Sequence, residues 1–238
     1  VTQNRGGASY WVGNQTGGPG TKFVPYWDKP GAVGYYDFGS LTMARTLGGT
    51  YSQVAAAHRR VLVGWIGGTP ASQSLARELT LSAEYELLQQ FVPELQMLRQ
   101  PWTGQSQQYE VYATFTVDPT KPLQFGVSFM CDSQYEKCAS LSFDCPGGTG
   151  DIICTTGVDG TPVGGKSSLG ELRVASGTQD LQVHAIIDGS IIEVIFNNRT
   201  AFVEYIQPEQ SPGTGVRLYE DPGVEASTSD FWDLAPIA

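Results

Sequence analysis

Four carboxylates lie among apolar or aromatic neighbours in this sequence, where an acid could do proton-transfer chemistry: Asp37, Glu78, Asp144 and Glu193. Cleavage of a glycosidic bond with retention needs two such groups, a nucleophile and a proton donor, about 5–5.5 Å apart. A single carboxylate does no such chemistry without a partner. The surroundings of each candidate therefore decide its interpretation.

Asp37 and Trp65 have the neighbours that a sugar site would use. Asp37 follows two tyrosines in "YYDFGSL", and aromatic rings beside a carboxylate suit a sugar, whose C–H faces stack while its hydroxyls form hydrogen bonds. Spacing alone favours an aspartate at a strand end or turn. Trp65 in "GWIGG" is by default a buried sheet aromatic, with a sugar platform as the alternative. Glu78 stands next to Arg77, which favours a local ion pair.

Glu193 lies in the apolar run "LQVHAIIDGSIIEVIFNN", residues 181–198. Asp188-Gly189 predicts a hairpin with a two-residue type I′ turn, because this turn needs positive φ at both positions. In that register the numbers of opposite residues add up to 377, so that His184 faces Glu193 and the alternate residues form an apolar face. A cross-strand pair of an acid and an imidazole contributes a few tenths to about 1 kcal/mol. We therefore expect a structural role for Glu193.

The four cysteines fall within 24 positions: Cys131, Cys138, Cys145 and Cys154. Their spacing is not C-x-x-C and the chain has only two histidines, which argues against zinc and favours disulfides. Three pairings are possible. The segments "FGVSFMC" and "CASLSFDC" resemble two strands of a hairpin, which favours Cys131–Cys138 and Cys145–Cys154.

Two Asn-x-Thr sequons, at Asn14 and Asn198, agree with disulfides and indicate glycosylation in an oxidising, secretory compartment. No run approaches the 18 or so apolar residues of a membrane span, and Val1 is not followed by a basic and apolar signal stretch. We therefore expect a soluble protein, secreted to the extracellular space or the vacuole, whose signal has been removed.

The composition indicates an all-β protein. Only 16% of the 238 residues are charged, while 29 Gly and 14 Pro separate runs of Val, Ile, Thr and aromatic residues. A hydrophobic fraction of 40% is sufficient for a core. The net charge of −10 argues against nucleic acid and anionic membranes as partners, because both require clustered Lys and Arg.

Three regions follow one another along the chain. Residues 1–81 read as strands that amount to about one four-stranded sheet, which is incomplete as a domain because one face lacks a second layer. Residues 82–108 form a connector, in which Pro93 predicts the start of a short helix. Residues 109–238 alternate strands with turns every 8 to 12 residues, which is typical of a β-sandwich.

The order of motifs resembles the C-terminal part of glycoside hydrolase family 32, the invertases, inulinases and fructosyltransferases. The segments are "YWVGNQTGGPGTKFVP", "YYDFGSLTMARTL", "RRVLVGWIGG", "SLARELTLS", "YELLQQFVPELQMLR" and "LQVHAIIDGSIIEVIFNN". They match the family patterns Y-x-x-G…F-x-P, D-Y-G-x-x-Y-A-S-x-x-F, R-R-x-x-x-G-W, P-R-E-L-x-L, L-x-Q-x-P-x-x-E-L-x-x-L-R and D-x-S-x-x-E-x-F. Each match is weak, but six in the correct order make the resemblance specific.

The resemblance implies the last portion of a five-bladed β-propeller followed by a two-sheet β-sandwich. It also implies that Asp37, which matches the D-Y-G aspartate, lies on the substrate side. Trp65 is the second substrate-binding candidate, as a sugar platform. Ser40 stands where plant relatives often have Lys, and Ala76 replaces the Pro before Arg77. No cofactor or metal is expected.

The departures concern catalysis. The family's nucleophile motif W-x-N-D-P-N-G, its R-D-P and its E-C do not occur as such, and "VDPTK" and "FDCPGG" resemble them only superficially and fall in the sandwich. We therefore expect this chain alone to be inactive and to carry no catalytic residue. The leading hypothesis is the C-terminal polypeptide of a cleaved fructosidase, held to an N-terminal chain that carries the three carboxylates and acting with retention on sucrose or fructans.

Two alternatives stay open. The chain could be a non-catalytic β-sandwich module that binds carbohydrate or stabilises an assembly, although such a module would begin near residue 105. It could also be part of a single longer enzyme. The sequence does not distinguish sucrose from inulin or levan, or hydrolysis from fructosyl transfer.

Overall fold

The chain forms two compact units in this computed structural model. The first unit comprises Val1–Leu95 and Asn198–Val203, and the second comprises Gln96–Asn197 and Glu204–Ala238. The residues that the structure describes are 8–15, 17, 20–29, 31–47, 59–67, 71–149, 152–159, 167–174, 179–206, 213–220 and 224–236.

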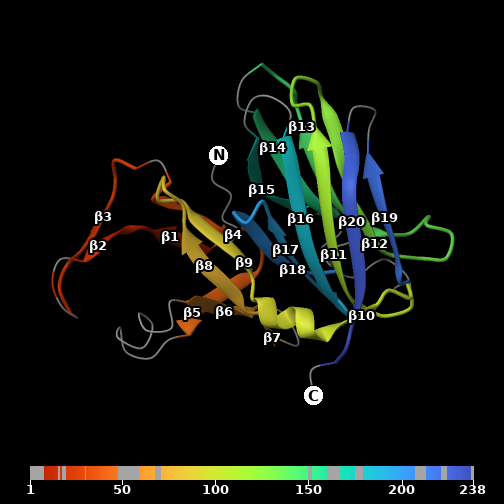
Figure 1. The fold of residues 1–238 in the computed structure, drawn as a ribbon, viewed down its shortest axis with the longest axis horizontal. Coiled ribbons are helices and arrows are strands. Elements are labelled where there is room, and N and C mark those ends of the chain that lie inside the picture. The colour runs from red at the N-terminus through yellow and green to blue at the C-terminus, as the bar shows by residue number, and fades with distance from the viewer. Residues whose placement is uncertain are drawn as a thin grey trace. The chain divides into compact units, whose positions relative to one another are not determined.

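The first unit is built from short antiparallel strands (Figure 1). The strands are β1 (Ala8–Trp11), β2 (Gly13–Gln15), β3 (Phe23–Pro25), β4 (Val33–Asp37), β5 (Leu41–Leu47), β6 (Arg60–Ile66), β7 (Ser72–Gln73), β8 (Arg77–Leu81) and β9 (Leu87–Phe91). Strands β1 and β4 pair, β2 and β3 pair, and β5-β6-β8-β9 form a larger sheet in which β7 also pairs with β6. This four-strand order is that of one propeller blade.

A 3₁₀ helix, η1, spans Pro93–Leu98 and begins at the proline that predicted it. Proline suits the first helical position because its missing N–H would have no intrahelical partner there. The helix leads into β10 (Arg99–Pro101), the first strand of the second unit. The predicted domain boundaries at residues 81 and 108 stay a prediction.

The second unit is a two-sheet β-sandwich, as expected (Figure 1). Its remaining strands are β11 (Gln108–Val117), β12 (Leu123–Cys131), β13 (Ala139–Cys145), β14 (Ile152–Asp159), β15 (Ser167–Val174), β16 (Gln179–Asp188), β17 (Ile191–Phe196), β19 (Gly215–Glu220) and β20 (Val224–Leu234). Strand β18 (Thr200–Tyr205) is also part of these sheets, but only its last two residues belong to the second unit. One sheet has the order β10-β20-β11-β16-β17-β18 and the other β15-β14-β13-β12-β19.

Aromatic rings fill the space between the two sheets. Phe115 of β11 lies 5.1 Å from Phe125 of β12, Phe125 stacks at 4.8 Å on Phe143 of β13, and Phe143 meets Phe196 of β17 edge-on at 4.9 Å. All four side chains are buried. Aromatic pairs at these distances contribute about 0.5–1.5 kcal/mol beyond the burial of their area, so this column of rings holds the sheets together.

The β16–β17 hairpin forms, but its predicted register is wrong. Asp188 pairs with Ile191, so the two-residue turn is Gly189-Ser190, one residue further along the chain than predicted. Gly189 has a φ of 57°, whereas Ser190 is not among the residues with positive φ. This is the requirement of a type II′ turn, which needs Gly only at its first central position, whereas Asp-Gly would fill a type I′ turn.

The shift moves every cross-strand partner by two residues and leaves the two faces as predicted. His184 lies opposite Ile195, and Glu193 lies opposite Ile186. The prediction that His184 lies directly opposite Glu193 is therefore wrong. The apolar face is buried as expected, because a displacement of two residues keeps each side chain on its own side of the sheet.

Both disulfides connect the cysteines that the sequence favours, Cys131 with Cys138 and Cys145 with Cys154. Cys131 ends β12 and Cys145 ends β13. Each bridge closes a short loop next to the second sheet and reduces the conformational freedom of the unfolded chain.

Candidate functional site

A buried ion pair lies at the end of β4 in the first unit. Asp37 and Arg77 both have 0% exposed side chains, and Arg77 Nη1 donates to Asp37 Oδ2 at 2.8 Å. The other carboxylate oxygen, Oδ1, accepts from the Gly39 backbone N–H at 2.8 Å. Gln89 Oε1 accepts from the same Arg77 nitrogen at 3.3 Å. The carboxylate is thus held by an arginine and by its own turn.

The electrostatics of Asp37 are those of a desolvated acid next to a cation. Burial raises the pKa of Asp37 above its ordinary value, while the charge and hydrogen bond of Arg77 and the backbone N–H groups of Gly39 and Val203 lower it. A buried pair of this kind is weak evidence for net stability. Removal of one partner alone, however, leaves an uncompensated buried charge, which costs about 3–5 kcal/mol.

The same network holds the segment Asn198–Val203, which belongs to the first unit. The Gln89 side chain donates to the carbonyl oxygen of Tyr36 at 2.7 Å and to a carbonyl oxygen of this segment at 2.8 Å. The backbone N–H groups of Phe38 and Ser40 donate to two more carbonyl oxygens of the segment, at 3.0 and 2.8 Å. The Asp37 turn is therefore tied to a segment more than 150 residues further along the chain.

Gly39 is required in this turn because the backbone of Val203 comes very close. A Cβ atom on Gly39 would lie 2.1 Å from the carbonyl oxygen of Val203. Any other residue would push the segment away. Close packing against Val203 thus explains why a glycine follows Phe38 in "YYDFGSL".

The predicted substrate-side roles of Asp37 and Trp65 stay predictions. Asp37 is fully buried, and its described contacts are those of a structural carboxylate. Trp65 lies on β6 with 50% of its side chain exposed, and its carbonyl oxygen accepts from the Thr42 hydroxyl at 3.1 Å. Trp65 is therefore not the buried aromatic that was its default interpretation.

The remaining carboxylate candidates have structural partners. Glu78 pairs with Arg59 at 3.1 Å, whereas its neighbour Arg77 pairs with Asp37. The local pair expected from the sequence is therefore wrong, because adjacent strand residues point to opposite faces. Asp144 is exposed and accepts from Gln124 at 3.4 Å.

A further buried carboxylate, Glu110 on β11, was missed by the prediction from the sequence. Arg99 donates to both of its oxygens, at 2.8 and 2.7 Å, and His184 Nε2 lies 2.6 Å from Oε1. Burial raises the pKa of Glu110, but the hydrogen bonds and charges of Arg99 and His184 lower it to about 2. The Arg99 guanidinium also stacks 3.8 Å from the ring centroid of Trp232. This cluster gives His184 the acidic partner that Glu193 was predicted to be.

The two predicted glycosylation asparagines are both exposed. Asn14 lies on β2, and Thr16 of its sequon falls outside the described residues. Asn198 has a φ of 54° and follows Asn197, with a φ of 47°, in the turn between β17 and β18. Positive φ at two successive residues is the feature of a type I′ hairpin turn. Glycosylation at both sites stays a prediction.

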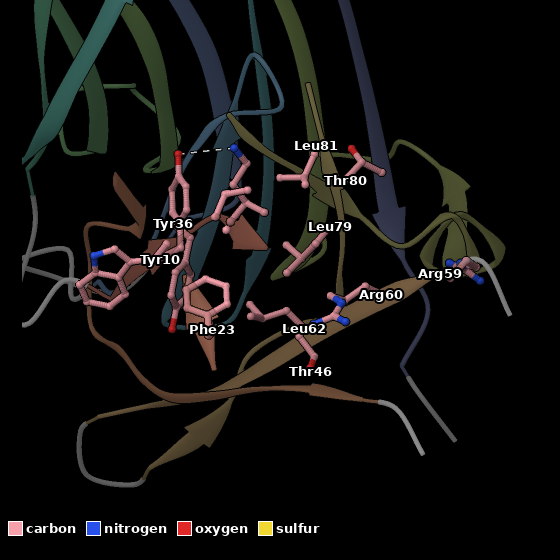
Figure 2. A pocket seen from close by; sticks show the side chains of 14 residues that line it. Tyr10, Phe23, Tyr36, Thr46, Arg59, Arg60, Leu62, Leu79, Thr80 and Leu81 are labelled. Carbon is pink, nitrogen blue, oxygen red and sulfur yellow. Dashed lines mark hydrogen bonds between the residues drawn. The ribbon is translucent and has the colours of Figure 1, made fainter. Parts of the chain in front are cut away.

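A cavity of about 750 Å³ opens in the first unit (Figure 2). Large apolar or aromatic side chains line most of it: Tyr10, Phe23, Tyr36, Leu62, Leu79 and Leu81. The two tyrosines lie on one side, and Leu79 and Leu81 on the other. Two arginines, Arg59 and Arg60, are the charged residues of the lining, and no described carboxylate takes part in it. The cavity is thus apolar with a basic margin.

Within the part of the chain that the structure describes, no group of three or more His, Cys, Asp or Glu side chains is arranged to hold a metal ion. Among the same residues, no helix is long and apolar enough to cross a membrane.

The family model for the C-terminal part of glycosyl hydrolases family 32 matches residues 78–233. The chain therefore belongs to this family, and the resemblance seen in the sequence is confirmed. A search of curated protein sequences finds no significant match.

Solved structures of three family enzymes share the fold. Exo-inulinase from Aspergillus awamori is 16% identical over 91% of this chain and 48% of its own, with a TM-score of 0.68. Sucrose-6-phosphate hydrolase from Lactobacillus gasseri is 14% identical over 94% and 47%, with a TM-score of 0.67. Fructan 1-exohydrolase IIa from Cichorium intybus is 17% identical over 89% and 52%, with a TM-score of 0.64. This chain thus spans about half the length of each structure.

Proposed function

We propose that this chain is the C-terminal part of a β-fructofuranosidase-type glycosidase whose catalytic carboxylates lie on a separate N-terminal chain. The complete protein would release a terminal β-fructofuranosyl unit from sucrose or a fructan with retention, through a fructosyl-enzyme intermediate. This chain contributes the last portion of the propeller and the whole sandwich, and it carries no catalytic residue.

The proposal depends on two findings together: the match to the family model, and the fact that this chain aligns with only about half the length of the solved family structures. The match extends over residues 78–233, while the structural similarity reaches 91% of this chain and only 48% of an exo-inulinase. The relatives named above are an inulinase, a sucrose-6-phosphate hydrolase and a fructan exohydrolase, which supports fructosyl substrates. The nucleophile motif W-x-N-D-P-N-G is not in this sequence, which supports an N-terminal origin for the carboxylates.

Within this function, Asp37 and Trp65 are the proposed substrate-side residues. The buried Arg77 would set the position of Asp37, and the half-exposed ring of Trp65 is available to a sugar face. The two disulfides and the exposed sequon asparagines support secretion or a vacuolar location and glycosylation at Asn14 and Asn198.

Native and denaturing mass spectrometry of the purified protein, with a sucrose and inulin assay on the same sample, tests this function. We expect a complex that separates on denaturation into this chain of 25.7 kDa and a chain with W-x-N-D-P-N-G, and that releases fructose only while intact. A single 25.7 kDa species without activity would contradict the proposal. A single longer polypeptide that releases fructose would support the proposed activity but contradict the proposal of a separate N-terminal chain.

The alternative is a non-catalytic sandwich that binds carbohydrate or stabilises an assembly. The closed aromatic core of the second unit favours it, because such a domain can fold alone. Glycan binding by residues 96–238 without any fructose release from the intact protein would support it.

A further inference from the structure

A cavity of about 420 Å³ lies in the second unit, where the end of β12 pairs with the start of β19. We propose that this cavity binds an uncharged saccharide through the ring of Tyr135 and the carboxylate of Asp132. The inference adds a binding site to the proposed function, and it rests on that function only in taking a fructan as the saccharide. The volume falls within the range of about 300–1,000 Å³ that is usual for small-molecule sites.

The lining of the cavity combines an aromatic ring, a carboxylate and hydroxyl groups. The loop after β12 supplies Asp132, Ser133 and Tyr135, and the segment that begins β19 supplies Thr214 between two glycines. The Thr214 hydroxyl donates to the carbonyl oxygen of Gly104, which lies between β10 and β11. The C–H face of a sugar stacks on an aromatic ring, while its hydroxyls form hydrogen bonds with oxygens of this kind. The lining therefore offers both types of contact that a saccharide makes.

The Tyr135 ring is positioned by a neighbouring glycine and is still partly open. A Cβ atom on Gly215 would lie 3.0 Å from Tyr135 Cε1, so the ring lies against the backbone of β19. The residue is nevertheless 43% exposed. Its φ of 57° is unusual for a bulky residue, and backbone conformations of this kind concentrate at ligand sites. The ring is thus held in place with free surface for a ligand.

A disulfide and backbone hydrogen bonds hold the loop that carries the ring. Cys131, which lines the cavity, is joined to Cys138 across the loop. The Asp132 backbone N–H donates to the carbonyl oxygen of Lys137 at 3.0 Å, and the Tyr135 N–H donates to the carbonyl oxygen of Asp132 at 3.1 Å. A site that is ordered before its ligand arrives loses little conformational freedom on binding.

The two oxygens of the Asp132 carboxylate have different surroundings. Oδ1 accepts from the backbone N–H groups of Gln134, Glu136 and Lys137, at 3.2, 2.9 and 3.4 Å. Oδ2 forms no hydrogen bond with the described residues. Burial raises the pKa of Asp132, but the three N–H groups and the charge of Lys137 lower it below its ordinary value, so the carboxylate is ionised at neutral pH. Oδ2 can therefore accept a charge-assisted hydrogen bond from a sugar hydroxyl.

The charge of the cavity favours an uncharged ligand. Asp132 is the charged residue in its described lining, to which no lysine, arginine or histidine contributes. An anionic sugar would meet this carboxylate without a cation to pair with. A small quaternary ammonium ion is the competing ligand, because it can contact both the carboxylate and the ring. It has no hydrogen-bonding group, however, for the hydroxyls of Ser133 and Thr214.

Titration of this 238-residue chain with an inulin tetrasaccharide, followed by the amide chemical shifts in NMR spectra, tests the site. We expect saturable shifts at the lining residues, from Gly104 to Gly215. Tyr135→Ala should weaken binding at least tenfold. Tyr85→Ala is the matched control and should leave binding unchanged, because Tyr85 is likewise an exposed tyrosine with positive φ, 67°, but lies outside this cavity.

A second pair of variants tests the carboxylate. Asp132→Asn retains one oxygen for the N–H groups of the loop and replaces the other by an amide group that cannot accept, so binding should weaken at least fivefold. Asp118→Asn is the control, because Asp118 holds a turn in the same way, by accepting from the Thr120 N–H at 3.0 Å, outside the cavity. Unperturbed amide spectra of the free variants show that each is folded. Equal effects of the paired substitutions would overturn the site.

The site and the proposed function can fail separately. If the lining amides of the folded chain do not shift, or shift with tetramethylammonium and not with the tetrasaccharide, the site is overturned, while fructose release by the complete protein still supports the proposed function. Saturable binding of the tetrasaccharide, without fructose release by the complete protein, would retain the site and reject the proposed function.

Discussion

The two units of this chain differ in how completely they bury their apolar side chains. Of the 36 buried hydrophobic residues among the described positions, 27 lie in the second unit and nine in the first. Of the 12 exposed large hydrophobic residues in the described part of the chain, ten lie in the first unit. A sheet needs a second layer to cover its apolar face, and only the sandwich supplies that layer itself.

The polar network of the first unit lies where apolar packing is incomplete. The sandwich is held by a continuous column of phenylalanines, whereas the described core of the first unit contains a buried arginine and aspartate among few large apolar side chains. A buried ion pair specifies one arrangement of its surroundings without adding much net stability. The described core of the first unit therefore depends on polar contacts more than that of the second.

The largest expected effect tests the self-sufficiency of the sandwich. Phe143→Ala removes the ring that stacks on Phe125 and meets Phe196, and should lower the free energy of unfolding of the second unit by about 3–5 kcal/mol. Tyr135→Ala, at an exposed position, is the control and should change it by less than about 0.5 kcal/mol. Amide hydrogen exchange of β11 and β16 at increasing urea concentrations measures the free energy of unfolding of the second unit in both variants. If Phe143→Ala lowers the free energy of unfolding by less than about 1 kcal/mol, the column of phenylalanine rings does not hold the two sheets together.

The next effect concerns the buried pair of the first unit. Arg77→Met leaves Asp37 buried without its cation and should destabilise the first unit by about 3–5 kcal/mol, at most as much as the sandwich variant loses. Hydrogen exchange of β4, β8 and β9 reports on this unit separately. The double variant Arg77→Met with Asp37→Asn should recover part of the loss, because no charge then stays unpaired. If the single variant exchanges like the wild type, the pair does not hold this unit together.

The pH dependence of stability distinguishes the contribution of Glu110 from that of other acidic residues in the sandwich. The pKa of Glu110 is about 2 in the folded protein, below its ordinary value of 4.5, so the unfolded chain binds more protons between these values. The stabilisation by Glu110 is therefore fully present above about pH 4.5 and is lost as the pH falls towards 2. Glu110→Gln should flatten this part of the stability curve, and the exposed Glu136→Gln should not. Thermal unfolding from pH 2 to 6 gives both curves.

The smallest effect tests the revised hairpin register. Gly189→Ala forces a side chain into positive φ and should destabilise the sandwich by about 1–2 kcal/mol, whereas Ser190→Ala should be nearly neutral. In the predicted register Asp188 would have positive φ as well as Gly189, so that Asp188→Gly would stabilise. Unfolding midpoints of the three variants distinguish the two turns.

Several elements could be predicted from local chemistry. The hairpin disulfides, the helix at Pro93 and the buried apolar face of β16 and β17 depend on spacing within a few positions, and all are present. The turn type was wrong because Asp-Gly and Gly-Ser both satisfy hairpin chemistry and differ by one residue. Glu110 was missed because its partners lie on other strands: β16, which pairs with β11, carries His184, and β10, on the far side of β20, carries Arg99.

The sequence alone determined the all-β class, the family and the faces of the strands, because composition, motif order and the two-residue period of a strand are local properties. The tertiary structure decided which charges meet. Asp37 finds Arg77 forty residues away, and the Gln89 side chain reaches the carbonyl oxygen of Arg199, 110 residues away. Such partners depend on how strands from distant parts of the chain are brought side by side, and no spacing along the sequence encodes that distance.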